Sequence, residues 1–363
     1  MDFFFPQKVK LGQGVSLNVG FAAKEEGARA LLTTEGAWED SKELSIVSQA
    51  LDRASVPYIL LTKNATQAAD RFIEEAASVI RASRADVVVT LGGNSLLSLG
   101  RTAVWRSQAQ KPPALIEVPV SVCFPLLLRR EAFVGSGHPS DLRFEPLPEG
   151  WRHRIFLDPH MATGQTPASS ISSLLETLFF AVEAFYQDSC GLTEESLLLG
   201  AIEELWQRMA KIYESPANVE NRHAAVQAGF NIALALGLMP RGAGLTLAFV
   251  LGSLLETAPT AFGSLFLAPF LEQLAGRSPE KTQRLARAFQ AEQWDGPASA
   301  LGPKLAQDVR KFLNTYKLPL RLADYGIVDT QIILAADVVR SMKLGRSSLL
   351  DSDSLEAFLR QIL

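Results

Sequence analysis

The chain is 363 residues long, with 47% hydrophobic residues and a formal net charge of −4. This length suggests roughly two domains, and the mild charge gives no reason to expect nucleic acid or an anionic membrane as a partner. Two cysteines, Cys123 and Cys190, are too few for a disulfide framework, and the most apolar window, 243–255, is shorter than the roughly 20 residues that span a bilayer. Because no signal-peptide core opens the chain, we expect a cytoplasmic protein.

The first part of the chain alternates short apolar runs with segments of helical periodicity. The apolar runs that predict strands are 28–33, 57–62, 86–91, 114–118 and 154–157. Segments with apolar residues on one helical face are 41–54, 65–83 and 95–108. Strands that are apolar throughout and separated by helices are typical of a parallel sheet covered on both faces. We therefore predict an α/β domain over residues 1–162.

Strand patterns stop after Pro167, and long helical patterns fill the rest of the chain. These patterns are 169–187, 193–213, 219–237, 242–256, 278–291, 304–316, 329–343 and 352–363. A succession of helices without strands predicts a second, all-helical domain over residues 163–363.

The run Gly92-Gly93-Asn94-Ser95 joins the predicted strand 86–91 to the helix that follows it. Glycine lets a phosphate approach the backbone closely, and a helix N-terminus offers free N–H groups to an anion. In parallel α/β sheets, ligands bind at the carboxyl ends of the strands. The same residues can also form an ordinary strand-to-helix turn, so the run alone leaves both interpretations open.

Residues 86–104 resemble a motif of the iron-containing alcohol dehydrogenases, in which an apolar strand is followed by Gly-Gly-Gly-Ser, two variable residues and Asp-x-Ala-Lys. Three positions match and three differ: Gly92, Gly93 and Ser95 match, whereas Asn94 replaces the third glycine, Ser98 the aspartate and Arg101 the lysine. Leu99-Gly100-Arg101 is also similar to the Gly-Leu-Gly-Lys of the maleylacetate reductases, a branch of the same family.

The resemblance extends over nearly the whole chain. It includes the opening strand up to Gly14, Val118-Pro119, Leu157-Asp158-Pro159 and the segment 318–326. It implies a Rossmann-like domain that holds NAD or NADP, followed by an all-helical domain, in the architecture shared with dehydroquinate synthase. The implied reaction is hydride transfer between the nicotinamide and a small alcohol or aldehyde in the interdomain cleft. The resemblance also implies a homodimer, for which Phe3-Phe4-Phe5 would suit an edge strand.

The cofactor-binding positions that the resemblance implies lie in two loops. They are Gly92, Gly93, Asn94, Ser95, Ser98, Val120 and Ser121. Val120 and Ser121 stand for the two family threonines after Val-Pro. The family's next segment, Gly-Thr-x-Ser-Glu, is replaced by Cys-Phe-Pro-Leu-Leu at 123–127. This bulkier apolar loop would narrow the channel for the pyrophosphate.

The family's metal ligands are replaced. Its Asp and His, four residues apart on one helix face, correspond to Glu176 and Phe180, and the histidine of its Pro-His-Gly step corresponds to Arg241. The segment that carries its remaining histidine is shortened between Gln227 and Met239 and contains no His. One carboxylate with a phenyl ring and a guanidinium does not make a divalent metal site. We therefore expect no metal.

Two residues at the former ligand positions, Glu176 and Arg241, are expected to be neighbours. They can form a plain salt bridge, or Arg241 can supply the positive charge that a metal supplies in the family. His160, which follows Asp158-Pro159, is the third candidate catalytic residue. Two functions stay open: a metal-independent NAD(P)-dependent oxidoreductase, or a non-redox protein that binds a small molecule. A lyase or synthase on the related scaffold is a less favoured third.

Overall fold

The computed structural model describes residues 5, 7–65, 67–108, 111–135, 138–147, 150–255, 260–273, 278–291, 295–342, 344 and 354–363. The chain forms two compact units. The first comprises Met1–Gln165 and Ser215–Gln227, and the second comprises Thr166–Glu214 and Ala228–Leu363. Phe3 and Phe4, which we expected at a dimer interface, lie outside the described residues.

The first unit is built on a parallel six-stranded sheet, as the apolar runs predict. Its strands are β1 (Lys8–Leu11), β2 (Ala30–Glu35), β3 (Tyr58–Lys63), β4 (Val87–Gly92), β5 (Ala114–Pro119) and β8 (His153–Leu157). Their order in the sheet is β1-β8-β5-β4-β2-β3, and every neighbouring pair is parallel. Strand β4 therefore lies between β2 and β5, so the loops after these three strands meet at one edge.

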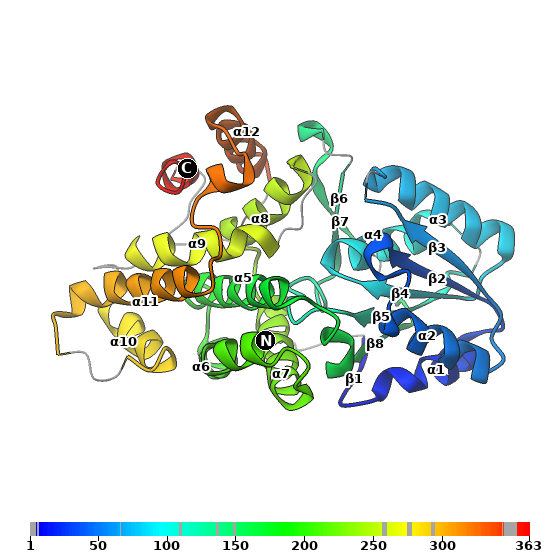
Figure 1. Cartoon of the computed structure of the whole chain (residues 1–363). Helices are drawn as coiled ribbons and strands as arrows, with labels where there is room; N and C mark the ends of the chain where they lie inside the picture. Colours follow the sequence, from blue (N-terminus) through cyan, green and yellow to red (C-terminus); the bar gives the residue numbers. More distant parts are fainter. Residues whose placement is uncertain are drawn as a thin grey trace. The chain divides into compact units, whose positions relative to one another are not determined.

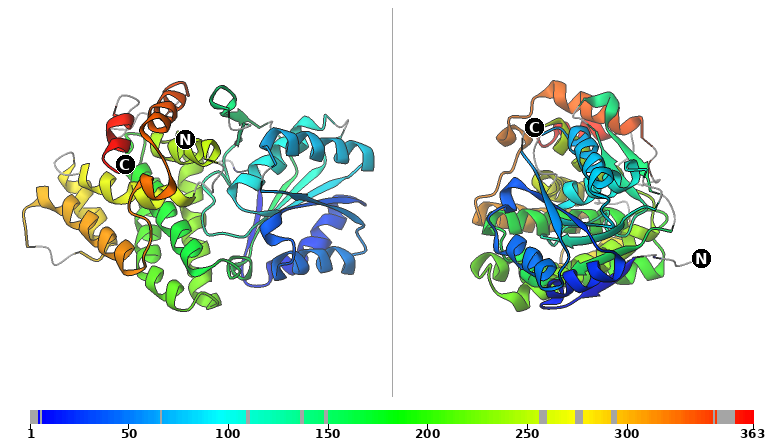
Figure 2. Two further views of the ribbon diagram at one scale, coloured as in Figure 1. Left: turned by 45° about the horizontal axis from the view of Figure 1, so that its top comes forward. Right: turned by 90° about the vertical axis from the view of Figure 1, so that its right-hand side faces the viewer.

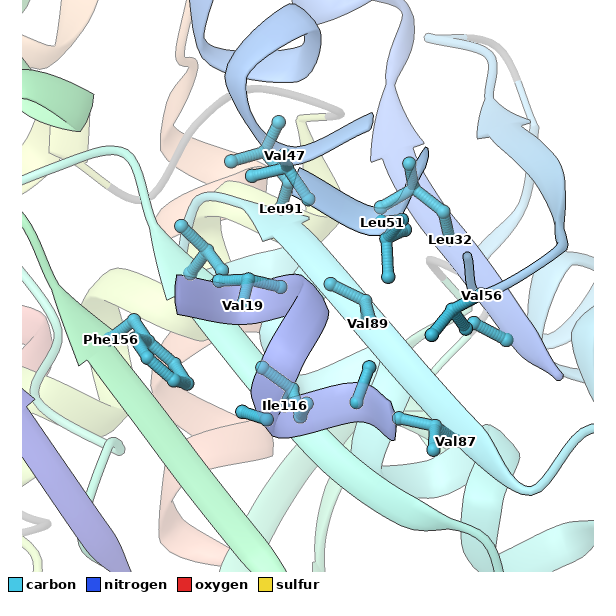
Figure 3. Packing of buried hydrophobic residues seen from close by; sticks show 14 of the residues in the cluster. Val19, Leu32, Val47, Leu51, Val56, Val87, Val89, Leu91, Ile116 and Phe156 are labelled. Atoms are coloured by element: carbon cyan, nitrogen blue, oxygen red, sulfur yellow. The ribbon is translucent and has the colours of Figure 1, made fainter. Parts of the chain in front are cut away.

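Helices cover both faces of this sheet (Figure 1). Helices α1 (Val19–Glu26) and α2 (Lys42–Arg53) lie on one face, and α3 (Ala69–Ser83) and α4 (Asn94–Arg106) lie on the other. Strand side chains alternate between the two cores. Val87 and Val89 of β4 pack with α1 and α2, as Figure 3 shows, whereas Val88 packs with α3 and α4.

Several elements of this unit are not predicted by the sequence patterns. They are the antiparallel hairpin of β6 (Glu131–Val134) and β7 (Arg143–Pro146), helix α1, and the 3-10 turns η1 (Val15–Asn18), η2 (Gly36–Trp38), η3 (Pro139–Asp141) and η4 (Pro159–Ala162). Strand β7 reads Arg-Phe-Glu-Pro and is partly exposed. It has no apolar run, so its pairing with β6 cannot be read from local composition.

The described part of the second unit is helical. Its helices are α5 (Pro167–Phe185), α6 (Leu192–Glu214), α7 (Val219–Leu238, which begins in the first unit), α8 (Ala243–Leu254), α9 (Thr260–Gln273), α10 (Pro279–Ala288), α11 (Leu301–Thr315), α12 (Asp329–Arg340) and α13 (Leu355–Arg360), with turns η5 (Ala298–Ala300) and η6 (Leu322–Tyr325). Helix α9 lies beside both α5 and α11 (Figures 1 and 2). Its sequence pattern did not predict it, since Pro269 interrupts it and its apolar residues surround the helix.

Helix α5 is the central helix of the second unit. It is long and apolar enough to cross a membrane, but 83% of its apolar window is buried within the protein. Its residues from Leu174 to Phe185 are all buried. A helix that is apolar all round and covered by neighbours is typical of a buried core.

Candidate active site

The glycine loop lies at the carboxyl end of β4, where α4 begins at Asn94. A Cβ at Gly92 would come within 2.7 Å of the Leu96 side chain, so Gly92 is needed for packing. A Cβ at Gly93 would meet only Glu35 Oε2, at 3.9 Å. Gly93 therefore leaves open space beside the backbone, next to the N–H groups of the first turn of α4. A phosphate group fits this arrangement.

Helix α4 packs very closely on β4. A Cβ at Gly100 would lie 2.4 Å from Thr90 Oγ1, so only glycine allows this approach. The Thr90 hydroxyl is buried and accepts a hydrogen bond from Thr33 Oγ1 at 3.1 Å. Close contact of this helix with its strand places the helix N-terminus directly over the strand end, as phosphate-binding turns require.

Glu35, the last residue of β2, reaches the same loop. Its Oε2 accepts the Gly93 N–H at 3.4 Å. Burial raises the pKa of the Glu35 carboxyl, although the Gly93 N–H and the charge of Lys63 act in the opposite direction. In the sequence alone, Thr33-Thr34-Glu35 leaves the choice between NAD and NADP open, although an acidic residue at the end of a strand beside the glycine loop is a recognisable signal.

The loop after β5 borders the glycine loop on the other side. The Val120 N–H donates to the Gly92 carbonyl at 3.2 Å, and the Cys123 N–H donates to Ser121 Oγ at 3.1 Å. Asn94 Nδ2 contacts Cys123 Sγ at 3.8 Å. The structure therefore brings the predicted residues Gly92, Asn94, Val120 and Ser121 together at one sheet edge.

A buried ion pair holds the loop after β5. Arg101 Nε and Nη2 donate to the two carboxylate oxygens of Glu117 at 2.6 and 2.8 Å, and His153 Nε2 lies 2.8 Å from Glu117 Oε2. Arg101 also donates to the carbonyls of Leu126 and Leu127, at 2.6 and 2.8 Å. Burial would raise the pKa of Glu117, but the charges of Arg101 and His153 outweigh it and lower the pKa to about 2.

The other predicted residues of the first unit have different surroundings. Ser95 is exposed at the start of α4, whereas Ser98 is buried on the same helix. Ser98 Oγ has no hydrogen-bond partner among the residues that the structure describes. His160 is half-buried in η4, and its backbone N–H donates to Asp158 Oδ1 at 3.1 Å. Asp158 also accepts the Ser16 N–H at 3.1 Å, so it ties η4 to η1.

In the second unit, Glu176 and Phe180 both lie on α5 and are fully buried or nearly so, at 0% and 1% exposure. Gly263 of α9 packs directly on Glu176, because a Cβ there would come within 2.5 Å of the Glu176 Cα. Phe180 adjoins Phe179, whose ring lies edge-on to that of Phe266. The position of Phe180 therefore belongs to an aromatic core.

Arg241 lies between α7 and α8 and is half-buried. The segment that follows it is fixed by Glu183 of α5, which accepts the N–H groups of Gly244 and Leu245 at 2.5 and 3.0 Å. A Cβ at Gly242 would lie 2.4 Å from the Glu183 carboxyl carbon. Burial raises the pKa of Glu183 to about 7, although both N–H donors favour its charged form. The expected pairing of Arg241 with Glu176 stays a prediction.

A parallel α/β unit with a glycine loop at its strand ends, followed along the chain by a helical unit, defines a two-domain class of fold in which the strand ends are the usual place for a ligand. Models of two parts of one family match this chain. The iron-containing alcohol dehydrogenase model matches residues 6–123, and the model of the C-terminal part of that family matches residues 170–361. The chain belongs to the iron-containing alcohol dehydrogenase family.

Individual relatives are distant in sequence and close in fold. A choline dehydrogenase of Bacillus subtilis is 21% identical over 308 residues, which cover 79% of this chain and 76% of that protein. The structure resembles maleylacetate reductase from Agrobacterium tumefaciens (TM-score 0.77, 17% identity, 100% and 97% coverage). It also resembles sulfoacetaldehyde reductase from Bifidobacterium kashiwanohense in complex with NAD+ (TM-score 0.83, 16% identity, 99% and 98% coverage).

The two groups that this family implies fit the chain unequally. The open space at Gly93 suits a dinucleotide phosphate. The positions that the sequence resemblance assigns to the family's metal ligands carry Glu176, Phe180 and Arg241, and neither a phenyl ring nor a guanidinium can ligate a divalent cation. Among the described residues, no group of three or more His, Cys, Asp or Glu side chains is arranged to hold a metal. Glu176, Phe180 and Arg241 therefore do not supply the ligands that a divalent metal ion needs.

Proposed function

We propose that this protein is a metal-independent, NAD(P)-dependent oxidoreductase that interconverts a small alcohol and its carbonyl compound. The observation that carries the proposal is the glycine loop at the start of α4, where the backbone at Gly93 is open to a phosphate while Gly100 brings α4 into close contact with β4. The family membership supports the reaction class. Bound nicotinamide would supply the hydride donor or acceptor.

The Glu35 carboxylate favours NAD over NADP. It lies at the end of β2 against the Gly93 N–H, where the acidic residue of a dinucleotide-binding unit binds the adenosine ribose hydroxyls. A 2′-phosphate placed there would bring a second negative charge beside this carboxylate, and like charges in a partly buried site repel strongly.

Arg241 is the residue that we assign to stabilise the substrate oxygen. Its guanidinium stays charged at any working pH, and a fixed cation stabilises the negative charge that develops on an alkoxide during hydride transfer. Glu183 positions the segment after Arg241 through the N–H groups of Gly244 and Leu245. We assign Glu176 as the partner that orients Arg241, and we keep His160, in the first unit, as a further candidate catalytic residue.

The remaining expectations belong to the same proposal. In this proposal, residues 1–162 would bind the nucleotide and residues 163–363 would supply the substrate-binding cation. We also propose a cytoplasmic homodimer whose partners are small molecules and not nucleic acid.

The proposal is tested by hydride transfer in protein stripped of metal. The purified protein is treated with excess EDTA, its metal content is measured by elemental analysis, and NADH oxidation is followed with a panel of small aldehydes and ketones. Turnover without stoichiometric metal supports the proposal. Turnover that is lost with EDTA and restored by Fe(II) or Zn(II), or no turnover with any compound, contradicts it.

A further inference from the structure

Two side chains meet beside the glycine loop at positions where the family pattern has glycine. Asn94 stands for the third glycine of the phosphate motif, and Cys123 stands for the glycine of the Gly-Thr segment after β5. Asn94 Nδ2 and Cys123 Sγ lie 3.8 Å apart. Where the family pattern has two glycines, this chain therefore has two side chains in contact with each other.

The cysteine side of this contact is held firmly. All residues from Val120 to Leu128 are buried, and Cys123 itself is 1% exposed. Arg101 binds the carbonyls of Leu126 and Leu127 and is itself anchored by Glu117. Asn94 is half-buried, whereas the Cys123 thiol is fixed in the interior. The contact can therefore open only if the Asn94 side chain turns away from the thiol.

The sheet order assigns a direction to a bound dinucleotide. The pyrophosphate of such a ligand lies at the helix N-terminus, and the acidic residue on the neighbouring strand binds the adenosine ribose. Here that residue is Glu35 of β2, on one side of β4. The nicotinamide half must leave on the other side of β4, over the loop after β5, which is the side that Asn94 and Cys123 bridge.

We propose that the Asn94–Cys123 contact is a specificity determinant that a full dinucleotide must open, whereas a ligand ending at the diphosphate, such as ADP, binds without opening it. This inference rests on the proposed function. NADH binding breaks this one weak hydrogen bond, which lowers the affinity for NADH by about threefold to tenfold. ADP ends before the Asn94–Cys123 contact, so its affinity is not lowered.

The test compares the binding of ADP and NADH to the wild type and to Asn94→Gly by titration calorimetry. Asn94→Gly removes only the side chain and keeps the backbone N–H groups that would bind phosphate, so it is expected to tighten NADH by about threefold to tenfold and to leave ADP within about twofold. Asn94→Ala and Cys123→Ala remove the same contact without adding glycine to the helix, and are expected to shift NADH in the same direction. Cys190→Ala is the matched thiol control and should change neither ligand.

The outcomes separate this inference from the function on which it rests. If both ligands bind and Asn94→Gly changes them equally, or weakens NADH, the contact does not discriminate and only this inference is overturned. If neither ligand binds the wild type or any variant, the nucleotide site and the proposed function are overturned as well.

Discussion

Arg101 and Glu117 form a two-point ion pair in which the side chains are 2% and 0% exposed. The pair connects α4 to β5. Through the hydrogen bonds from Arg101 to two carbonyls, it also connects them to the loop after β5, which borders the glycine loop. A buried pair of this kind adds little relative to apolar residues, but the loss of one partner leaves an unpaired charge in the interior. Its role here is to fix the loop in one conformation.

Glu117→Gln should destabilise the protein by about 3 to 5 kcal/mol, because Arg101 would keep its charge without a carboxylate. The Glu117 pKa is lowered from 4.5 to about 2, so the carboxylate contributes stability above pH 4.5 that is lost as the pH falls towards 2. Urea unfolding between pH 7 and 3 measures both effects.

The control is Glu204→Gln, since Glu204 pairs with Arg208 on a partly exposed helix face and should change stability by only about 0.5 kcal/mol. An unfolding free energy for Glu117→Gln within 1 kcal/mol of that control would rule out a structural role for the pair (about 1 kcal/mol being the usual spread of surface substitutions).

Glu183 should give the opposite pH dependence. Its pKa is raised from 4.5 to about 7, so the folded state holds a proton that the unfolded state releases. Stability should therefore fall as the pH rises from 4.5 to 7, by on the order of 3 kcal/mol at most. Glu183→Gln keeps an acceptor for one N–H and removes the titration, so its stability should be flat over this range. Parallel pH profiles of wild type and variant would show that Glu183 titrates normally.

The parallel sheet and most helices follow from local patterns, because buried parallel strands such as β4 are apolar throughout and amphipathic helices such as α3 show one apolar face. Helix α9 escapes this reasoning, since burial on all sides removes the periodic pattern. The hairpin β6–β7 depends on pairing between residues distant in sequence, which composition does not record.

The candidate site divides in the same way. The Gly92–Ser95 turn is visible in the sequence because glycine and a strand-to-helix switch are local signals. The clamp of Arg101 on Glu117 joins residues 16 positions apart on different elements, and the contact of Glu35 with Gly93 joins residues 58 positions apart. Only the sheet order, which brings β2, β4 and β5 together, makes these contacts predictable.

Gly93→Val should abolish nucleotide binding and leave the fold intact, because the new side chain would enter the open space at the turn without striking the core. Gly92→Val is the matched contrast, since its Cβ would collide with Leu96 and should lower the melting temperature. Titration with NADH and thermal unfolding separate the two effects. Equal NADH affinity in Gly93→Val and the wild type would place the nucleotide elsewhere.

Arg241→Met should lower kcat by about 100-fold or more while the affinity for NADH stays unchanged, since the lost charge would act on the substrate oxygen in the transition state. Arg241→Lys keeps the charge without the planar fork and should retain part of the activity. Steady-state kinetics with the best aldehyde or ketone substrate measures the difference. Full activity of Arg241→Met would remove Arg241 from the mechanism.

The central claim is that this member of the family binds a nicotinamide nucleotide without a metal, and the most direct measurement is an NADH fluorescence titration before and after exhaustive chelation. We predict saturable binding with one site per chain and the same dissociation constant in both samples, because the glycine loop at Gly93 would bind the phosphate through backbone N–H groups. Absence of binding in both samples, or binding that disappears with the chelator and returns with Fe(II) or Zn(II), would contradict the account.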